Sequence, residues 1–475
     1  MATQLRRALG LRSIVSTSTG LAFAAIDYLA AASLIGGVAG DSAWLAVVIA
    51  GVLLLLVWGA FSELNGLFPT AAAIRLYMAK AMDDRVALTI TFTYLLTIVL
   101  VVAADAYIVG SAIAYVLGGA LWVAIIFIVA LLALATLANL RGIRVAGSVQ
   151  DIATYTVLLA SAVIAVIALA RGGFALRTPL APVDASHPVG NLIEAVALAI
   201  FLYSAFEWVT TSAEEARSPQ LIPRGMLIAL GLLCFVCVLL TLGMSHLLTA
   251  SQRATAYPQL FLAERAAGGI GLFIMLAVTM LTAVNTFNGA FLTASRFMYA
   301  TAREGSLPPV FARLNTWAAP WAPIIALGVS SLVCAIVVAL TGAWPVLVAT
   351  GAALEAMIYA VAGYCVWRLR HKLPDQARPF SMPLAGALGL LSCVLFGVLA
   401  LIASVTVGTT TNPAPLIIIL VAGALAAAYV LLALPRIRQA EAARRAARGS
   451  RREAARAAKA QQAVTSDLTS QPPLP

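Results

Sequence analysis

Long runs of hydrophobic residues alternate with short polar segments along the whole chain. Each run has roughly the 20 residues that an α-helix needs to cross the ~30 Å hydrocarbon layer of a membrane. Short strands of alternating polarity, which a membrane barrel would need, are not seen. The pattern therefore predicts an all-α membrane protein with twelve transmembrane helices, at residues 14–36, 43–63, 87–117, 121–140, 151–170, 192–213, 226–249, 269–298, 321–341, 345–367, 384–405 and 414–435.

Composition and charge agree with this pattern. A water-soluble protein is excluded because 62% of the 475 residues are hydrophobic and only 10% are charged. The 30 Lys and Arg residues are spread unevenly, and the side opposite the termini holds Arg171, Arg177, Arg253 and Arg265 alone. Because cytoplasmic loops carry the excess of positive charge, both termini are predicted to be cytoplasmic. The protein is then a multi-pass protein of the plasma membrane.

The net charge of +11 follows from this orientation and from the basic tail. It does not indicate a nucleic-acid partner, because no basic and aromatic groove lies outside the membrane. The strong preference for Arg over Lys, together with much Ala, is typical of a GC-rich bacterial genome, so the membrane is predicted to be the inner membrane of a bacterium.

Three stretches outside the membrane have a character of their own. Residues 171–191, which contain three prolines, and residues 250–269 are predicted as irregular loops on the outer side. The Ala-rich and basic tail that follows residue 435 fits a helix lying on anionic lipid and, equally, a solvated helix. Residues 466–475 are predicted to be disordered.

Two acids interrupt the hydrophobic runs in corresponding places. Residues 23–29 read Phe-Ala-Ala-Ile-Asp-Tyr-Leu and residues 203–209 read Tyr-Ser-Ala-Phe-Glu-Trp-Val, with the same order of aromatic, small, apolar and acidic positions. Asp27 and Glu207 each lie about ten residues into their run, near the middle of the membrane at ~1.5 Å per residue. Matched interruptions are typical of secondary transporters, in which substrate binds where two broken helices meet.

Such breaks are tolerated only where they line a cavity or are buried in protein. Backbone N–H groups freed at the start of a half-helix attract an anion, whereas the two acids suit an ammonium group, so a zwitterion fits. The predicted substrate-binding residues are Thr19, Gly20, Phe23, Ala24, Ala25, Asp27, Tyr28, Tyr203, Ser204, Ala205, Phe206 and Glu207.

Other polar residues also lie at membrane depth. An ionisable group there costs at least ~2.5 kcal/mol and marks a pathway by default, but Asp105 and Glu355 equally fit hydrogen bonds between helices. Asn285 and Thr286 fit a helix-joining role, and Thr286 also suits a sodium site between the first and eighth helices. The candidate coupling or gating residues are Asp27, Asp105, Glu207, Asn285, Thr286 and Glu355.

No cofactor and no metal site are expected, because the three histidines lie in separate regions. Tyr203 and Phe206 suit either an aromatic gate or ordinary packing. A nucleophile, a metal cluster or paired acids at helical spacing, which an enzyme would need, are not seen.

Four motifs resemble signatures of the amino acid, polyamine and organocation permeases. They are FSELNGLFP at residues 61–69, TSAEEARSPQLIPR at 211–224, ASRFMYATAREGSLP at 294–308 and RPFSMP at 378–383. The resemblance implies a LeuT-like core of five-plus-five inverted repeats at residues 14–367, with discontinuous first and sixth helices that hold the substrate. Helices 11 and 12 follow at 368–435, between a cytoplasmic N-terminus at 1–13 and a cytoplasmic tail at 436–475.

The chain also departs from the family pattern. The family has a glycine-rich run in the first helix that receives a substrate carboxylate, but Ala24 and Ile26 replace the later glycines here, and Ala205 stands before the acid of the sixth helix. Some proton-coupled members carry a lysine in the fifth helix, and residues 156–157 have none.

The predicted function is secondary active transport of an amino acid by alternating access, coupled to an ion such as a proton or working by exchange. The alternative is a polyamine, amine or other organic cation carrier, which the lost glycines and the extra carboxylates favour. A membrane enzyme or a ligand sensor is the third class. The expected partners are a small-molecule substrate and the lipid bilayer, with no nucleic acid, and the oligomeric state is left open.

Overall fold

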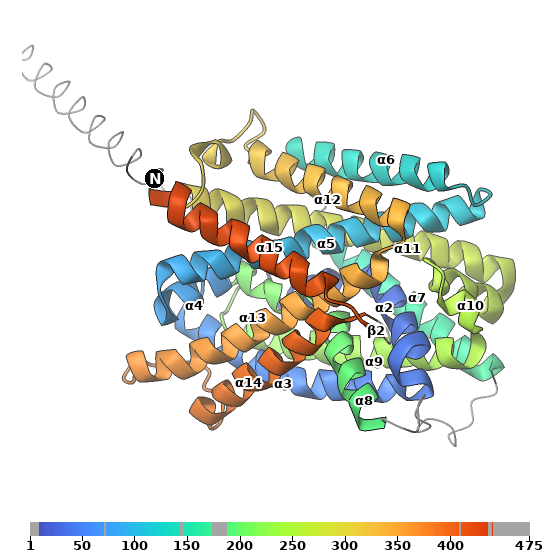
Figure 1. Ribbon diagram of the computed structural model, residues 1–475, viewed down its shortest axis with the longest axis horizontal. Helices are drawn as coiled ribbons and strands as arrows, with labels where there is room; N and C mark the ends of the chain where they lie inside the picture. Colours follow the sequence, from blue (N-terminus) through green and yellow to red (C-terminus); the bar gives the residue numbers. More distant parts are fainter. Residues whose placement is uncertain are drawn as a thin grey trace, which may run out of the picture.

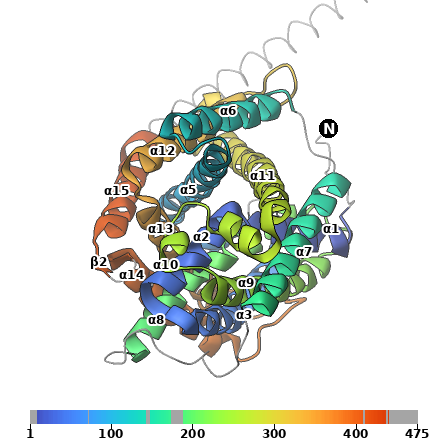
Figure 2. The same cartoon turned by 90° about the vertical axis from the view of Figure 1, so that its right-hand side faces the viewer.

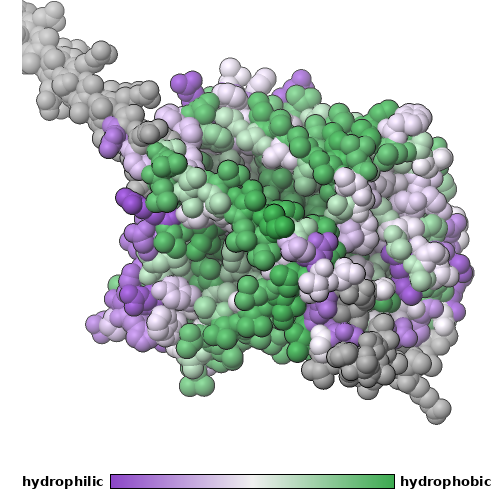
Figure 3. Space-filling view, viewed as in Figure 1, coloured by the Kyte–Doolittle hydropathy of each residue, from purple (hydrophilic) through white to green (hydrophobic). Residues whose placement is uncertain are grey.

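The computed structural model describes residues 9–70, 73–142, 147–172, 188–407, 410–435 and 439. Eleven helices of this part are long and apolar enough to cross a membrane, or twelve when the bent pair α1 and α2 counts as one span. The helices run roughly side by side as one bundle (Figure 1). On the face shown in Figure 3, hydrophobic residues cover the middle of the bundle, and hydrophilic ones gather toward its two ends. The prediction of an all-α membrane protein is confirmed.

The spans follow the predicted order closely. They are α1 Leu11–Ala22 with α2 Ala25–Leu34, α3 Ala43–Leu67, α5 Asp84–Val116, α6 Leu121–Leu140, α7 Gly147–Arg171, α8 Pro188–Ala199 with η3 Ile200–Tyr203 and η4 Phe206–Ser212, α9 Leu221–Leu247, α11 Pro258–Arg303, α12 Trp321–Thr341, α13 Trp344–Lys372, α14 Ala385–Val405 and α15 Ala414–Ala428. The short elements are η1 Ile35–Ala39, η2 Gly40–Ser42, α4 Ala73–Ala81, α10 Ala250–Arg253, η5 Pro309–Ala312, β1 Thr406–Val407, β2 Thr410–Thr411 and η6 Tyr429–Ala433.

One predicted loop is wrong. Residues 250–269 are largely helical, because α10 opens with a capping box at Thr249 and Pro258 begins α11. Proline at the first helical position has no amide to satisfy and a preset φ. The predicted start of the hydrophobic segment, at residue 269, directly follows a break in α11, where Gly268 has a φ of 67°. The loop predicted at 171–191 and the tail at 436–475 lie almost wholly outside the described residues.

The broken spans lie inside the bundle. In the span that contains η3 and η4, and in α13, 83% of the most apolar stretch is buried within the protein, against 11% for α15. Figure 2 looks along the bundle and shows α2 inside it, with α6 and α15 at the periphery. Polar groups on the interior spans therefore face protein rather than lipid.

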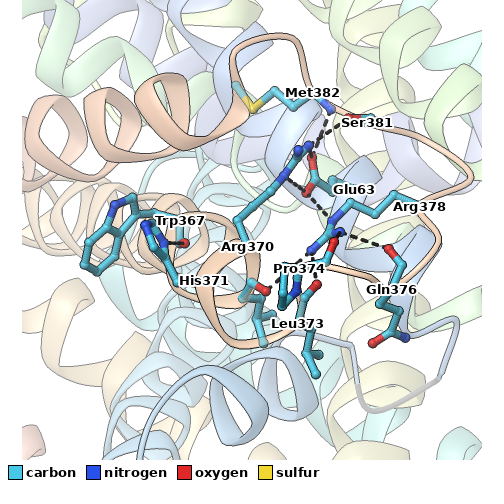
Figure 4. Close-up of polar contacts among 11 residues, drawn as sticks. Glu63, Trp367, Arg370, His371, Leu373, Pro374, Gln376, Arg378, Ser381 and Met382 are labelled. Atoms are coloured by element: carbon cyan, nitrogen blue, oxygen red, sulfur yellow. Dashed lines mark hydrogen bonds and ion pairs between the residues drawn. The ribbon is translucent and has the colours of Figure 1, made fainter.

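Two of the four motifs meet at one end of α3. The carboxylate of Glu63 is 1% exposed and accepts two hydrogen bonds of 2.8 Å from the guanidinium of Arg370. Arg378 Nε lies 3.2 Å from the same carboxylate, and the backbone N–H of Met382 donates to it at 2.9 Å (Figure 4). The cluster fixes the loop before α14 against the end of α3.

The other two motifs also meet. Arg296 of α11 pairs with Glu215, which follows η4, at 3.2 Å. The chain just before α1 lies alongside the same segment, because the Leu9 N–H donates to the Glu215 carbonyl oxygen and the Arg217 N–H donates to the Leu9 carbonyl oxygen, both at 3.0 Å. The N-terminal end of α1 is thus fixed to the segment that leaves the sixth span.

Candidate functional site

The first and sixth spans are both interrupted within their length, as predicted. Between α1 and α2 the chain is extended at Phe23 and Ala24, and the two helices are bent by 57°. In the sixth span, Ser204 is extended and Ala205 is left-handed with a φ of 72°. The Ser18 hydroxyl of α1 donates to the carbonyl oxygen of Phe206 at 2.6 Å. The two breaks are therefore neighbours.

Two carboxylates occupy the start of α2. Asp27 Oδ2 accepts the backbone N–H of Ala24 at 2.7 Å, so the acid folds back over the break. Asp105 of α5 reaches the same helix end, where its Oδ1 accepts the N–H of Ile26 at 3.1 Å. The exposed N–H groups of a helix start form an anion site, and here the protein fills that site with its own side chains.

Asp105 also faces the eighth span. Its carboxylate lies close enough to the Thr286 hydroxyl of α11 for an electrostatic interaction. Among the described residues, neither Asp105 Oδ2 nor Thr286 Oγ1 has a partner in hydrogen-bond geometry. The neighbouring Asn285 side chain donates to Thr154 Oγ1 of α7 at 3.3 Å. This bond joins two helices, which is the role that the sequence favoured for Asn285.

The second break carries a different cluster. Glu207 accepts hydrogen bonds from the hydroxyls of Tyr94 at 2.9 Å and Tyr359 at 3.1 Å. Glu355 of α13 lies 3.1 Å from the same Tyr94 hydroxyl. The indole N–H of Trp208 also donates to the Tyr94 oxygen. Both carboxyl groups are buried, with Glu207 2% and Glu355 0% exposed.

The four acids therefore form two pairs. Asp27 and Asp105 share the start of α2, whereas Glu207 and Glu355 share a tyrosine hydroxyl. Within the described residues, no hydrogen bond joins Asp27 to Glu207. The structure brings the two predicted breaks together but gives each its own polar cluster.

A pocket lies beside the second cluster. Its volume is about 520 Å³, part of which is open to solvent. Among the described lining residues, Glu207 is the charged one. The lining continues to Ile74 of α4 and Phe297 near the end of α11, so the pocket extends toward the side on which α4 lies. Its lining residues are Phe61, Ala73, Ile74, Thr91, Tyr94, Leu95, Ile98, Glu207, Trp208, Thr210, Thr211, Thr293, Ala294 and Phe297.

The predicted hydroxyl and aromatic residues take several positions. Tyr28 bonds to Ser161 of α7 at 2.6 Å and Tyr203 donates to the Val47 carbonyl oxygen at 2.7 Å, so both tie a broken span to a neighbour. The Thr19 hydroxyl donates to the Val15 carbonyl oxygen within its own helix. The buried Ser204 hydroxyl has no hydrogen-bond partner in the part of the chain that the structure describes.

The other predicted residues pack closely around the breaks. Phe23 meets Tyr28 edge-on at 5.5 Å between ring centres. Gly20 allows α1 to approach α7, because a β-carbon there would collide with the Thr154 side chain. Phe206 packs against Tyr359 at 6.3 Å, and Ala24, Ala25 and Ala205 are buried.

Sequence reasoning missed Tyr94, Trp208 and Tyr359. Each is an aromatic residue in a hydrophobic run, where packing is the usual role, and the only signal was the polar tip of each ring. That signal gains meaning only when the fold places these rings against two carboxyl groups.

Comparisons with known proteins agree on the type of protein. The pattern of the amino acid permease family matches residues 9–424. The large neutral amino acids transporter small subunit 2 of Oryctolagus cuniculus is 28% identical over 267 residues, which are 53% of this chain and 48% of that protein. The chain thus aligns with about half the length of this relative. A probable GABA permease of Pseudomonas aeruginosa is 25% identical over 72% of this chain and 74% of the relative.

Solved structures show the same fold at low identity. A crystal structure of the Eremococcus coleocola manganese transporter, in complex with an aromatic bis-isothiourea substituted compound, has a TM-score of 0.53 and 16% identity, covering 92% of this chain and 98% of that one. A variant of that transporter gives a TM-score of 0.58 at 15% identity, covering 91% and 98%.

Proposed function

The chain belongs to the amino acid permease family, and from this premise we propose that it carries an amino acid across the membrane as a secondary transporter. One observation carries the proposal: two broken spans are neighbours inside the bundle, and Glu207 at one break is among the residues that line a pocket. Broken helices at membrane depth mark substrate sites in transporters of inverted-repeat architecture.

The proposed mechanism is alternating access, coupled to a proton or working by exchange. The substrate ammonium binds at Glu207, and residues 19–28 and 203–207 surround the substrate. The two broken spans then move together against the rest of the bundle. Their link through Ser18 and the Phe206 carbonyl oxygen, and the pairing of Leu9 with residues 215–217, support movement as one unit.

Uptake by proteoliposomes tests this function. The purified protein should accumulate a radiolabelled neutral amino acid inside the vesicles when a proton gradient is applied, and should exchange internal for external substrate without one. Glu207→Gln should weaken substrate binding, measured as a smaller stabilisation of the protein by substrate in thermal unfolding. Binding without any flux would instead favour a sensor.

A second candidate is an amine or organic cation carrier, and a specific observation favours it. The helix start that would receive a substrate carboxylate is already bonded to Asp27 and Asp105. A cationic substrate needs only Glu207 and does not compete with these carboxylates. Competition of uptake by an amino acid and by its decarboxylated amine separates the two candidates, because only an amine carrier should prefer the amine.

The orientation is also a proposal. Both termini are placed in the cytoplasm of a bacterial cell, with α4 on the cytoplasmic side of the plasma membrane, as the positive charge of the loops supports. The pocket beside Glu207 then extends toward the cytoplasm. The division at residues 13, 367 and 435 and the binding of the tail to anionic lipid are proposed on the same sequence grounds.

A further inference from the structure

Glu207 and Glu355 come from different spans and reach one hydroxyl group. Tyr94 Oη lies 2.9 Å from Glu207 Oε1 and 3.1 Å from Glu355 Oε2, and it also accepts the indole N–H of Trp208. Tyr359 Oη lies 3.1 Å from the second oxygen of Glu207. All five side chains are buried, with at most 9% of any one of them exposed.

Counting hydrogens shows what this geometry requires. A tyrosine hydroxyl has one hydrogen to donate and two lone pairs that accept, whereas an ionised carboxylate only accepts. Tyr94 can therefore donate to Glu207 or to Glu355, but not to both. If both acids were ionised, one carboxylate would face the Tyr94 oxygen at 3.1 Å or less with no hydrogen between them. Two negative charges would also lie close together in a buried site.

One added proton resolves the conflict. With the proton on Glu355, its O–H donates to the Tyr94 oxygen, the Tyr94 O–H donates to Glu207 Oε1, and the Tyr359 O–H donates to Glu207 Oε2. Trp208 fills the remaining lone pair of Tyr94. Every donor then has an acceptor, and the pair carries one negative charge instead of two.

We propose that Glu207 and Glu355 bind a single proton between them across Tyr94, and that this proton is the one coupled to transport. The coupling rests on the proposed function, whereas the bound proton follows from the geometry alone. The proton passes from Glu355 to the Tyr94 oxygen as the hydrogen of Tyr94 passes to Glu207. No electron moves, and the total charge of the cluster stays the same.

The surroundings supply no competing charge. Among the described residues, the titratable groups that interact with the two acids are Tyr94 of α5 and Tyr359 of α13. Of the other elements packed against η4 and α13, α9 carries Cys237 beside Asp27, and α8 carries the half-buried Glu194. Other elements around this region contribute Ser18 of α1, Phe61 of α3, Ile74 of α4, Thr293 of α11 and Phe396 of α14.

The arrangement couples the proton to movement. Glu207 belongs to the broken sixth span, whereas Glu355 belongs to α13, so movement of the broken span separates the two carboxyl groups. Glu207 and Tyr94 line the pocket, and Glu355 does not. A proton that has passed to Glu207 is therefore released into the water of the pocket, on the side of α4.

The coupling of the proton to transport is tested by measuring substrate accumulation and exchange in the variant Glu355→Gln. An amide N–H replaces the carboxylic O–H as the donor to Tyr94, so the variant imitates the protonated pair permanently. The expected result is loss of gradient-driven accumulation, by at least tenfold, with substrate exchange retained. Glu194→Gln is the matched control, because it removes a carboxyl group from the same sixth span outside the cluster, and it should keep both activities.

Infrared difference spectroscopy tests the bound proton without transport. The purified protein at neutral pH should show the C=O stretching band of a protonated carboxylic acid, and the band should disappear in Glu355→Gln and shift in Tyr94→Phe. Absence of the band in the parent protein overturns the proposal even if every variant transports. If the parent protein shows the band but Glu355→Gln accumulates substrate along the gradient as well as the parent does, the coupling is overturned. A parent protein that transports no substrate but shows the band overturns the proposed function alone.

Discussion

The carboxylate of Asp27 accepts the backbone N–H of Ala24 across the break between α1 and α2, at 2.7 Å. An acid at the third helical position whose side chain accepts the backbone N–H of the N-cap residue forms half of a capping box. Asp27 thus holds the break in shape, and it takes a position that a substrate carboxylate would otherwise occupy. Asp27, which the sequence assigns to substrate binding, thus has a structural partner of its own.

Replacing Asp27 tests this cap. Asp27→Ala leaves the Ala24 N–H buried without a partner and should lower the stability of the protein by about 1–3 kcal/mol. Asp27→Asn keeps a carbonyl oxygen as acceptor, so its loss should be less than half as large. Thermal unfolding in detergent ranks the variants by stability. Asp375→Ala, in an exposed loop, is the control and should stay within about 0.5 kcal/mol of the parent. If Asp27→Ala and this control had the same melting temperature, Asp27 would not act as a cap.

Ala205 is strained, and a glycine should relieve the strain. Its φ of 72° lies in the left-handed region, which costs a residue with a β-carbon about 1–2 kcal/mol. Ala205→Gly should therefore raise the melting temperature. Ala197→Gly, in the helical part of the same span, should lower it, because glycine costs about 0.5–1 kcal/mol in a helix. The idea fails if both glycines destabilise the protein equally.

The sequence predicted the spans and the breaks for simple reasons. Membrane thickness fixes the length of an apolar run, and the similar order of residues around Asp27 and Glu207 marks two corresponding interruptions. The positions of Phe23 and Ala205 at the breaks were accordingly within reach of sequence reasoning.

The partners of the acids were not within reach. Glu207 meets Tyr94 and Tyr359 from spans far away in the chain, and nothing local to Glu207 specifies either contact. Because the sequences around Asp27 and Glu207 match, the two acids are expected to share one site. The fold instead gives Asp27 a bond to Ala24 and brings Asp105 to the same helix start, since α5 passes beside α2.

The cluster around Glu63 should be a main source of stability at one end of the bundle. Removing one partner from a buried ion pair leaves an uncompensated charge and costs about 3–5 kcal/mol. Glu63→Gln leaves Arg370 and Arg378 without their carboxylate, so the protein should melt at a much lower temperature. Arg368→Gln changes a neighbouring charge outside the cluster and should have little effect. Similar melting of the two variants would show that the cluster contributes nothing.

The direction of the pocket can be tested by labelling single cysteines. With the five native cysteines replaced, Thr293→Cys should react with a small charged thiol reagent, because residue 293 lines the pocket. The reagent should act from one side of the membrane only, the side that labels a cysteine at the exposed Lys80 of α4. Ser161→Cys is the control, because that position is fully buried between helices and should stay unlabelled from both sides. Labelling of residue 293 from the side opposite α4 would contradict the direction of the pocket and the proton release path that depends on it.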